Sequence, residues 1–153
     1  MITAWRIVHP MYADDAFSGE GPRRRGGRWN PPKTAVVYTA SSVALATLEL
    51  LVHNPRALLL PEYVLFSCSF PEAIVESVDR KRLPAKWRDY PPPVELQGIG
   101  NEWLQSRASA VLEVPSAVVE EEVNYLLNPE HDDFRSVDIG GPRPFHVDLR
   151  LLT

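Results

Sequence analysis

The chain has 153 residues, the size of one folded domain, and its 44% hydrophobic and 24% charged residues are ordinary for a globular protein. The formal net charge of -4 excludes broad attraction to nucleic acid or anionic membranes, so a bound anion must be held by a local cluster of basic residues. The single cysteine excludes an internal disulfide and a metal site built on several thiolates. No run approaches the roughly 20 apolar residues of a membrane span. The first ten residues lack the layout of a signal peptide, so we expect a cytoplasmic protein that does not enter membranes.

Strand-like runs outnumber helical ones along the chain. In chain order the predicted elements are a strand (3–8), a polar loop (about 13–27), a strand (34–39), a helix (41 or 42 to about 54), two strands paired across a short turn (63–70 and 73–78), an interrupted helix (94–106), a strand (109–115), a short helix (120–128) and a closing strand (144–152). Ser41 or Ser42 is the expected N-cap of the first helix, and the Asn54-Pro55 pair is expected to end it. This order predicts an α+β fold with a mixed or antiparallel sheet and a few helices.

The first predicted helix carries one carboxylate among aliphatic residues. Glu49 follows Leu45 by four positions and precedes Val52 by three, so the helical period places it on the apolar face with Leu48. The rest of this helix is largely apolar too, which predicts that it is packed on most sides. A buried carboxylate must be paired, protonated or directed into a cleft. Glu49 is therefore either half of a structural ion pair, a helix-edge residue that reaches water, or an active-site residue.

The sequence RRRGGR places four arginines around two glycines: Arg23, Arg24, Arg25 and Arg28. Guanidinium groups suit phosphate, and glycines let backbone amides approach an anion. For the first three a solvated basic loop is the preferred interpretation. Arg28 instead leads through Trp29 and Asn30 toward the strand before the Glu49 helix, so it is expected to lie near that helix. The four histidines show no metal-ligand spacing, so we predict no metal site: His9, His53, His131 and His146.

Two long segments in this order resemble the RES domain, GGRWNPP…VVYTASSVALATLELLVH and VLEVPSAVVEEEVNYLLNPEH. The likeness runs from WRI near the start to NPEH near the end, which implies a single RES domain over 1–153. The family is similar in fold to ADP-ribosyltransferases, and its members are toxins of RES-Xre type bacterial toxin-antitoxin pairs that consume NAD+. The resemblance thus implies NAD+ as a substrate and no separate cofactor.

The resemblance also implies a set of site residues. Arg28 matches the family arginine and Glu49 the family glutamate, while Tyr38 matches a site tyrosine. Ser116 best matches the serine, and Arg6 falls in a family-like motif and is expected to bind substrate. Ser106 and Ser109 are weaker candidates for the serine.

The implied function is that of a type II toxin that cleaves the nicotinamide–ribose bond of NAD+ and arrests growth. Its implied partner is an Xre-like helix-turn-helix antitoxin that covers the active site, so that DNA is contacted only through the antitoxin, with a dimer inside the complex. Three alternatives stay open: ADP-ribosylation of a host protein, a non-catalytic nucleic-acid-binding module that uses the arginines from Arg23 to Arg28, and a regulator that binds NAD+ without cleaving it.

Overall fold

A computed structural model describes residues 1–54 and 60–152. They form a seven-stranded sheet in the order β4-β5-β6-β2-β1-β3-β7. The strands are β1 (Ile2–Val8), β2 (Val37–Ala40), β3 (Glu62–Phe70), β4 (Val75–Ser77), β5 (Val111–Pro115), β6 (Val123–Leu127) and β7 (Asp138–His146). The α-helices among these residues are α1 (Glu20–Arg25), α2 (Val43–His53) and α3 (Val94–Ser106). Strand β4 pairs in parallel with β5 and the other described pairings are antiparallel, which confirms the predicted α+β class with a mixed sheet.

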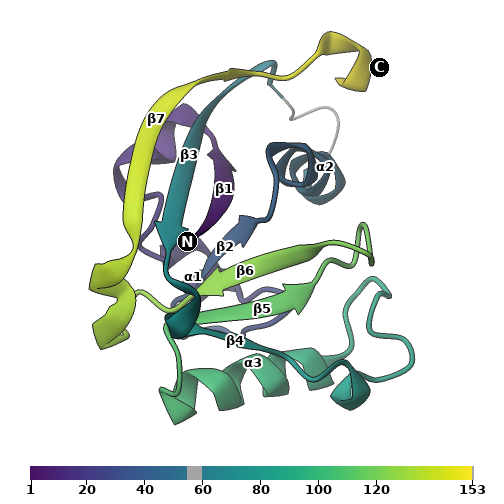
Figure 1. The fold of residues 1–153 in the computed structure, drawn as a ribbon. Helices are drawn as coiled ribbons and strands as arrows, with labels where there is room; N and C mark the ends of the chain where they lie inside the picture. Colours follow the sequence, from purple (N-terminus) through teal and green to yellow (C-terminus); the bar gives the residue numbers. More distant parts are fainter. Residues whose placement is uncertain (55–59, 153) are drawn as a thin grey trace.

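The sheet opens between β2 and β1, which divides it into two halves, β4-β5-β6-β2 and β1-β3-β7. Helix α2 lies at this opening. Strand β1 pairs with β3 over its whole length, but its ladder with β2 consists of the single pair Trp5 and Ala40. Helix α2 lies in this fork, beside β1 and β2 (Figure 1). Ser42 caps the helix by accepting a hydrogen bond from the Leu45 amide, and buried Leu45 and Ala46 pack it on Ala40. The helix therefore presents one side to the opening of the sheet.

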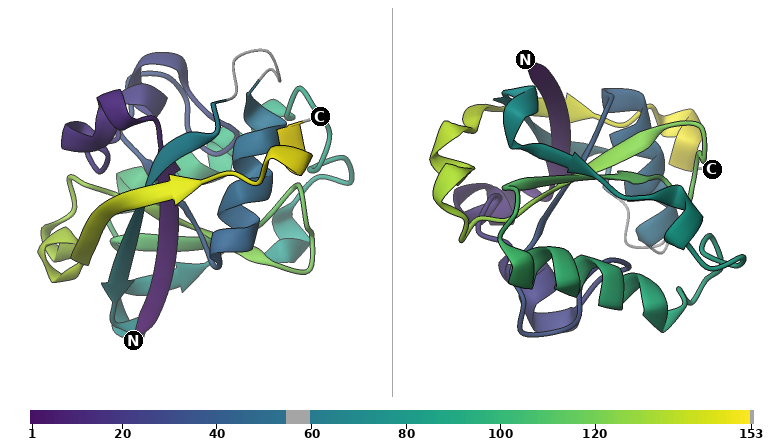
Figure 2. Two further views of the ribbon diagram at one scale, coloured as in Figure 1. Left: turned by 90° about the horizontal axis from the view of Figure 1, so that it is seen from above. Right: turned by 60° about the horizontal axis from the view of Figure 1, so that its bottom comes forward.

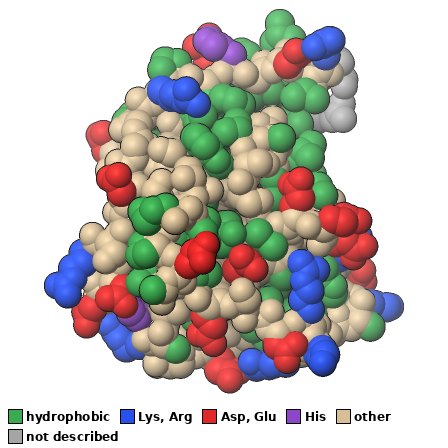
Figure 3. Space-filling view, viewed as in Figure 1, with side chains coloured by type: hydrophobic (Ala, Val, Ile, Leu, Met, Phe, Trp, Pro, Cys, Tyr) green, Lys and Arg blue, Asp and Glu red, His purple; other side chains and the backbone are tan. Residues whose placement is uncertain are grey.

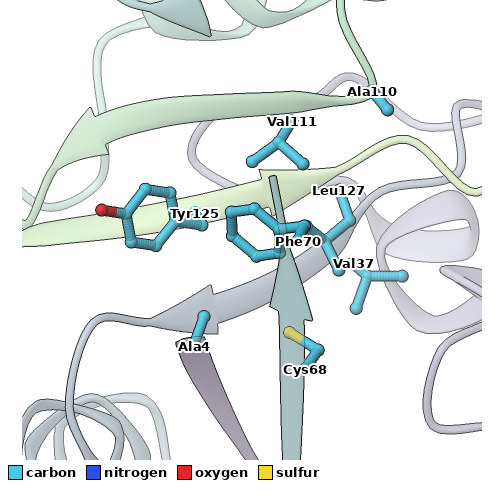
Figure 4. Close-up of a cluster of buried hydrophobic side chains, with 8 residues drawn as sticks. All are labelled: Ala4, Val37, Cys68, Phe70, Ala110, Val111, Tyr125 and Leu127. Carbon is cyan, nitrogen blue, oxygen red and sulfur yellow. The ribbon is translucent and has the colours of Figure 1, made fainter. Parts of the chain in front are cut away.

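Two buried clusters form most of the core around the sheet. The first joins strands of both halves and is drawn in Figure 4: Ala4, Val37, Cys68, Phe70, Ala110, Val111, Tyr125 and Leu127. The second lies under α3, which covers the sheet beside β4 and β5 (Figure 2): Trp29, Val36, Leu96, Trp103, Leu112, Val114 and Leu126. Gly100 of α3 lies so close to the Trp29 carbonyl that an added Cβ would overlap it. This close approach fixes the loop that contains Arg28 against the helix.

The predicted helix over 120–128 is wrong, because these residues form a turn followed by β6. Strand β6 lies between β2 and β5 and pairs with both. Three glutamates favour a helix N-terminus, but burial of Tyr125, Leu126 and Leu127 between two neighbours outweighs that local preference.

Three other expectations need correction. The two strands over 63–70 and 73–78 do not pair with each other, since β3 pairs with β1 and β7, while β4 pairs with β5. The closing strand begins earlier than predicted, at Asp138, and residues Leu149–Leu152 form a 3-10 turn. Strand β7 is at the edge of the sheet, where Pro142 and Pro144 are tolerated because one side of the strand needs no ladder partner. The polar loop over 13–27 contains α1.

The surface gives no support to a broad nucleic-acid face on the side drawn in Figure 3, where acidic and basic side chains are interspersed. No helix among the described residues is long and apolar enough to cross a membrane. The helix-ending role predicted for Pro55 falls on a residue outside the described part of the chain, and α2 itself ends at His53.

Candidate active site

Helix α2 is packed on one side only, which corrects the prediction that it is covered on most sides. Leu45 is buried, but Leu48 is 40% exposed and Val52 is 62% exposed. The side chain of Glu49 lies between these extremes, with 20% of its surface exposed. The buried residues of the helix are Leu45, Ala46 and Thr47. Glu49 is directed toward the opening in the sheet.

Three side chains donate hydrogen bonds to the Glu49 carboxylate. Ser116 Oγ and Asn124 Nδ2 donate to Oε1 at 2.9 and 2.8 Å, and His53 Nε2 lies 3.1 Å from Oε2. Burial alone would raise the pKa of Glu49, but the hydrogen bonds from His53, Asn124 and Ser116 outweigh it and hold the pKa below its ordinary value. Glu49 is therefore an ionised, partly desolvated carboxylate at neutral pH.

The position of Ser116 follows from the turn after β5. Ser116 is fully buried, and its hydroxyl accepts hydrogen bonds from the backbone amides of Val118 and Val119 at 3.1 Å each while donating to Glu49. A hydroxyl has one donor and two acceptor sites, so all three are in use. This arrangement suits a residue that orients Glu49 better than one that binds a nucleotide directly.

The two weaker serine candidates lie elsewhere. Ser109 Oγ accepts from Trp103 Nε1 at 2.8 Å and donates to the Val111 carbonyl at 2.9 Å. Ser106 Oγ donates to the Trp103 carbonyl at 2.8 Å. Both serve the end of α3 and its junction with β5.

Asn124 is a site residue that sequence reasoning missed. It lies on β6 opposite Ala40 of β2 and Val114 of β5, so its segment had to be recognised as a strand before its direction could be inferred. Its Oδ1 atom is buried and has no hydrogen-bond partner within the described part of the chain. An unpaired buried acceptor beside a cavity is available to a ligand that donates a hydrogen bond. His53, one helical turn after Glu49, contacts that carboxylate and lines both cavities.

Arg28 is tied to a second loop by its guanidinium group. Its Nη1 donates to the carbonyls of Trp87 at 2.8 Å and Asp89 at 3.1 Å. Desolvation lowers the pKa of Arg28, while the nearby Glu49 carboxylate opposes this shift. The side chain remains a cation at neutral pH because guanidinium starts from a pKa far above it.

Tyr38 fixes the loop that carries Arg28. The Tyr38 hydroxyl donates to Asn30 Oδ1 at 2.6 Å and accepts from the Trp29 amide at 3.2 Å. Burial raises the pKa of Tyr38, so the phenol stays neutral. A Cβ added at Gly27 would press on the Tyr38 hydroxyl, which explains the small residue before Arg28.

Arg6 reaches the site from β1. Its Nε donates to the Ala16 carbonyl at 2.7 Å, and its Nη1 donates to the Tyr38 carbonyl at 3.0 Å. Burial lowers the pKa of Arg6 to about 10, which still leaves it charged at neutral pH. Arg6 lines the smaller of two cavities at the site, and Arg28 lines the larger.

Two cavities meet at Glu49. The smaller has a volume of about 210 Å³ and includes Trp5 and Arg6 in its wall. The larger has a volume of about 720 Å³ and includes Arg28, Arg88 and Tyr90. The two share four lining residues: Tyr38, Glu49, His53 and Asn124. A carboxylate at the junction of two cavities can act on a bond in the middle of an elongated ligand.

The three arginines of α1 that precede Arg28 in the sequence do not line either cavity. Arg23 and Arg24 each contact Glu20 of the same helix at 3.4 Å, and their side chains are exposed. Neither these residues nor Arg25 lines either cavity. The structure thus separates Arg28 from the three arginines before it.

Comparison with known proteins places the chain in a family. The model of the RES domain matches residues 3–148. The chain belongs to the RES domain family. A Yersinia enterocolitica relative named Toxin Res is 39% identical over 148 residues, which cover 96% of this chain and 97% of the relative. A Sphingobium relative named Prs ADP-ribosylating toxin is 38% identical over 154 residues, which cover 97% of this chain and 95% of the relative.

The fold has a solved counterpart. The crystal structure of the M. tuberculosis MbcT-MbcA toxin-antitoxin complex contains a chain that matches with a TM-score of 0.72 at 20% identity, covering 99% of this RES chain and 86% of that chain. The predicted membership among RES toxins is confirmed by the family match and the named relatives. The name of the Sphingobium relative agrees with the predicted likeness to ADP-ribosyltransferases.

Proposed function

We propose that this RES toxin cleaves the nicotinamide–ribose bond of NAD+ and so depletes the NAD+ of its host. The observation that carries the proposal is the ionised Glu49 carboxylate at the junction of two cavities, with Arg6 beside one and Arg28 beside the other. NAD+ is an elongated substrate whose labile bond lies between a small aromatic ring and a much larger anionic nucleotide. The two unequal cavities suit its two unequal parts.

The chemistry needs a fixed negative charge and little else. Nicotinamide leaves as a neutral group, and positive charge develops on the ribose at its anomeric carbon. A carboxylate near that carbon stabilises the oxocarbenium-like transition state, as in glycosidases. The three donors keep Glu49 ionised and hold it in one orientation before substrate binds, so little reorganisation is needed during the reaction.

The substrate is expected to lie with nicotinamide in the smaller cavity, against Trp5 and Tyr38. The ribose would lie at Glu49, where the unpaired Asn124 Oδ1 would accept a hydrogen bond from a ribose hydroxyl. The diphosphate would enter the larger cavity near Arg28. The described hydrogen bonds of Arg28 use Nη1, so its Nε and Nη2 protons suit a phosphate.

The acceptor of the ADP-ribosyl group separates two versions of this function. Water or phosphate as acceptor gives NAD+ degradation, which we favour. A protein acceptor gives ADP-ribosylation, which the name of the Sphingobium relative favours. Mass spectrometry of the products formed from NAD+, with and without phosphate and with a bacterial lysate, distinguishes the three acceptors.

We also propose a cognate antitoxin as partner, because cleavage of NAD+ would kill the host in the cytoplasm. The solved structural counterpart comes from a toxin-antitoxin complex. An Xre-like helix-turn-helix antitoxin would cover the cavities, contact DNA itself and bring two toxin chains together as a dimer. The exposed Leu48 and Val52 lie on the helix that borders the site, and Val52 lines the larger cavity, so they suit a covering segment.

The decisive experiment is incubation of the purified protein with NAD+ and chromatographic detection of free nicotinamide. We expect release by the wild-type protein, strong loss in Glu49→Gln, and growth arrest on expression that follows the same order. Arg28→Ala is also expected to abolish toxicity. The proposal is wrong if the folded wild-type protein releases no nicotinamide, or if a folded Glu49 variant stays equally toxic.

A further inference from the structure

The loop over residues 87–90 lies outside the predicted site and contributes Arg88 and Tyr90 to the wall of the larger cavity. Arg28 holds one side of this loop through the carbonyls of Trp87 and Asp89. Arg88 holds the other side, because its Nε donates to the Ala117 carbonyl at 3.0 Å. Arg88 also contacts the Val118 carbonyl at 3.4 Å and the Glu120 carboxylate at 3.6 Å. The loop is therefore fastened to both walls of the cavity.

The loop presents an aromatic side chain that the fold itself does not bury. Tyr90 lines the larger cavity, yet 84% of its surface is exposed to solvent. By contrast Tyr38, which lines the same cavity, is anchored through its hydroxyl. A large exposed ring at a cavity wall offers an open face on which a planar group can stack.

The positions of the charged groups indicate which planar group this is. Tyr90 lines the larger cavity and not the smaller, whereas Glu49 lines both. Arg28 is near enough to interact electrostatically with Glu49 and with Tyr90. The larger cavity thus offers a carboxylate, a guanidinium and an aromatic ring as partners for the ribose, diphosphate and purine of a dinucleotide.

We propose that Tyr90 stacks on the adenine base of the substrate and that Arg88 positions the loop that carries it. The assignment rests on the proposed cleavage of NAD+ and adds the residue that recognises the adenylate half. Tyr90 is a binding residue in this scheme, and it takes no part in breaking the bond at Glu49. Its removal should weaken binding of any ligand with an adenine diphosphate and spare ligands without one.

The test compares NAD+ with nicotinamide mononucleotide, which keeps the scissile bond and lacks the adenylate half. Tyr90→Ala should raise KM for NAD+ about tenfold, equivalent to about 1.4 kcal/mol of binding, with kcat nearly unchanged. The same variant should cleave the mononucleotide with unchanged KM, and Tyr90→Phe should behave as the wild type. Tyr12→Ala is the matched control, because Tyr12 is also exposed (57%) but lines neither cavity.

A second measurement keeps this inference separate from the cleavage reaction. Calorimetric titration with ADP, which has no nicotinamide, should show binding that is about tenfold weaker in Tyr90→Ala than in the wild type. A raised KM for NAD+ with an unchanged KM for the mononucleotide, together with weaker ADP binding, supports the assignment. Equal effects on both nicotinamide substrates, or equal ADP binding by wild type and variant, overturn it. Absence of nicotinamide release would refute the proposed function, and the ADP titration would still decide the role of Tyr90.

Discussion

Replacing Glu49 by Gln removes the negative charge while preserving the shape of the side chain. The Gln carbonyl can still accept from Ser116 and Asn124, the two donors that now contact Oε1. A unit charge about 4 Å from a developing cation is worth about 4 kcal/mol at an effective dielectric constant near 20. The Glu49 side chain is 20% exposed, so we reduce this to about 3 kcal/mol for screening by water. Nicotinamide release should therefore slow by about 150-fold.

The stability of the same variant provides the internal control. Glu49→Gln should cost about 1 kcal/mol of unfolding free energy, because hydrogen bonds to a charged acceptor become bonds to a neutral one. Glu49→Ala leaves Ser116 and Asn124 without their acceptor and should cost about 2–6 kcal/mol, since each of the two stranded donors costs about 1–3 kcal/mol. Urea unfolding followed by circular dichroism measures both.

The decisive comparison is turnover of Glu49→Gln at a temperature where it is fully folded. Turnover within a few-fold of the wild-type value would refute the assignment of this carboxylate to charge stabilisation. A 150-fold loss accompanied by a 3 kcal/mol loss of stability would also count against the reasoning, because the isosteric change would then act through the fold.

Two further predictions concern acid sensitivity and packing. The pKa of Glu49 lies below its ordinary value of 4.5, so activity and the stability that this group contributes should persist above that value and fall as pH drops through the folded-state pKa. Ser116→Ala removes one of the donors that lower the pKa of Glu49, so kcat/KM should begin to fall at a higher pH than in the wild type. An unchanged acidic side of the pH profile in the folded variant would contradict this. Gly100→Ala should lower the free energy of unfolding by about 3 kcal/mol or more, because a Cβ there overlaps the Trp29 carbonyl. Gly98→Ala is its control on the same helix and has open space around it, so it should stabilise by about 0.5–1 kcal/mol; equal effects of the two changes in urea unfolding would refute the packing argument.

The missed strand shows where local patterns fail. Residues 123–127 follow three glutamates and contain two leucines, which together favour a helix by local preference. They become a strand because β2 and β5 offer ladder partners on both sides; the β5 partners lie 8 to 16 positions away in the sequence and the β2 partners 84 to 90. Sequence reasoning therefore could not place Asn124, whose contact with Glu49 depends on that pairing.

The sequence by itself determined the α+β class, the capped helix with an isolated carboxylate, and the segments that resemble the RES domain. These depend on periodicity, capping and motifs, which are properties of neighbouring residues. Only the tertiary structure decided which serine meets Glu49, that His53 and Asn124 also donate to it, and that Arg28 fastens a loop from residues 87–90. Such contacts join residues up to 75 positions apart. Their geometry is set by strand order and core packing, which no local pattern encodes.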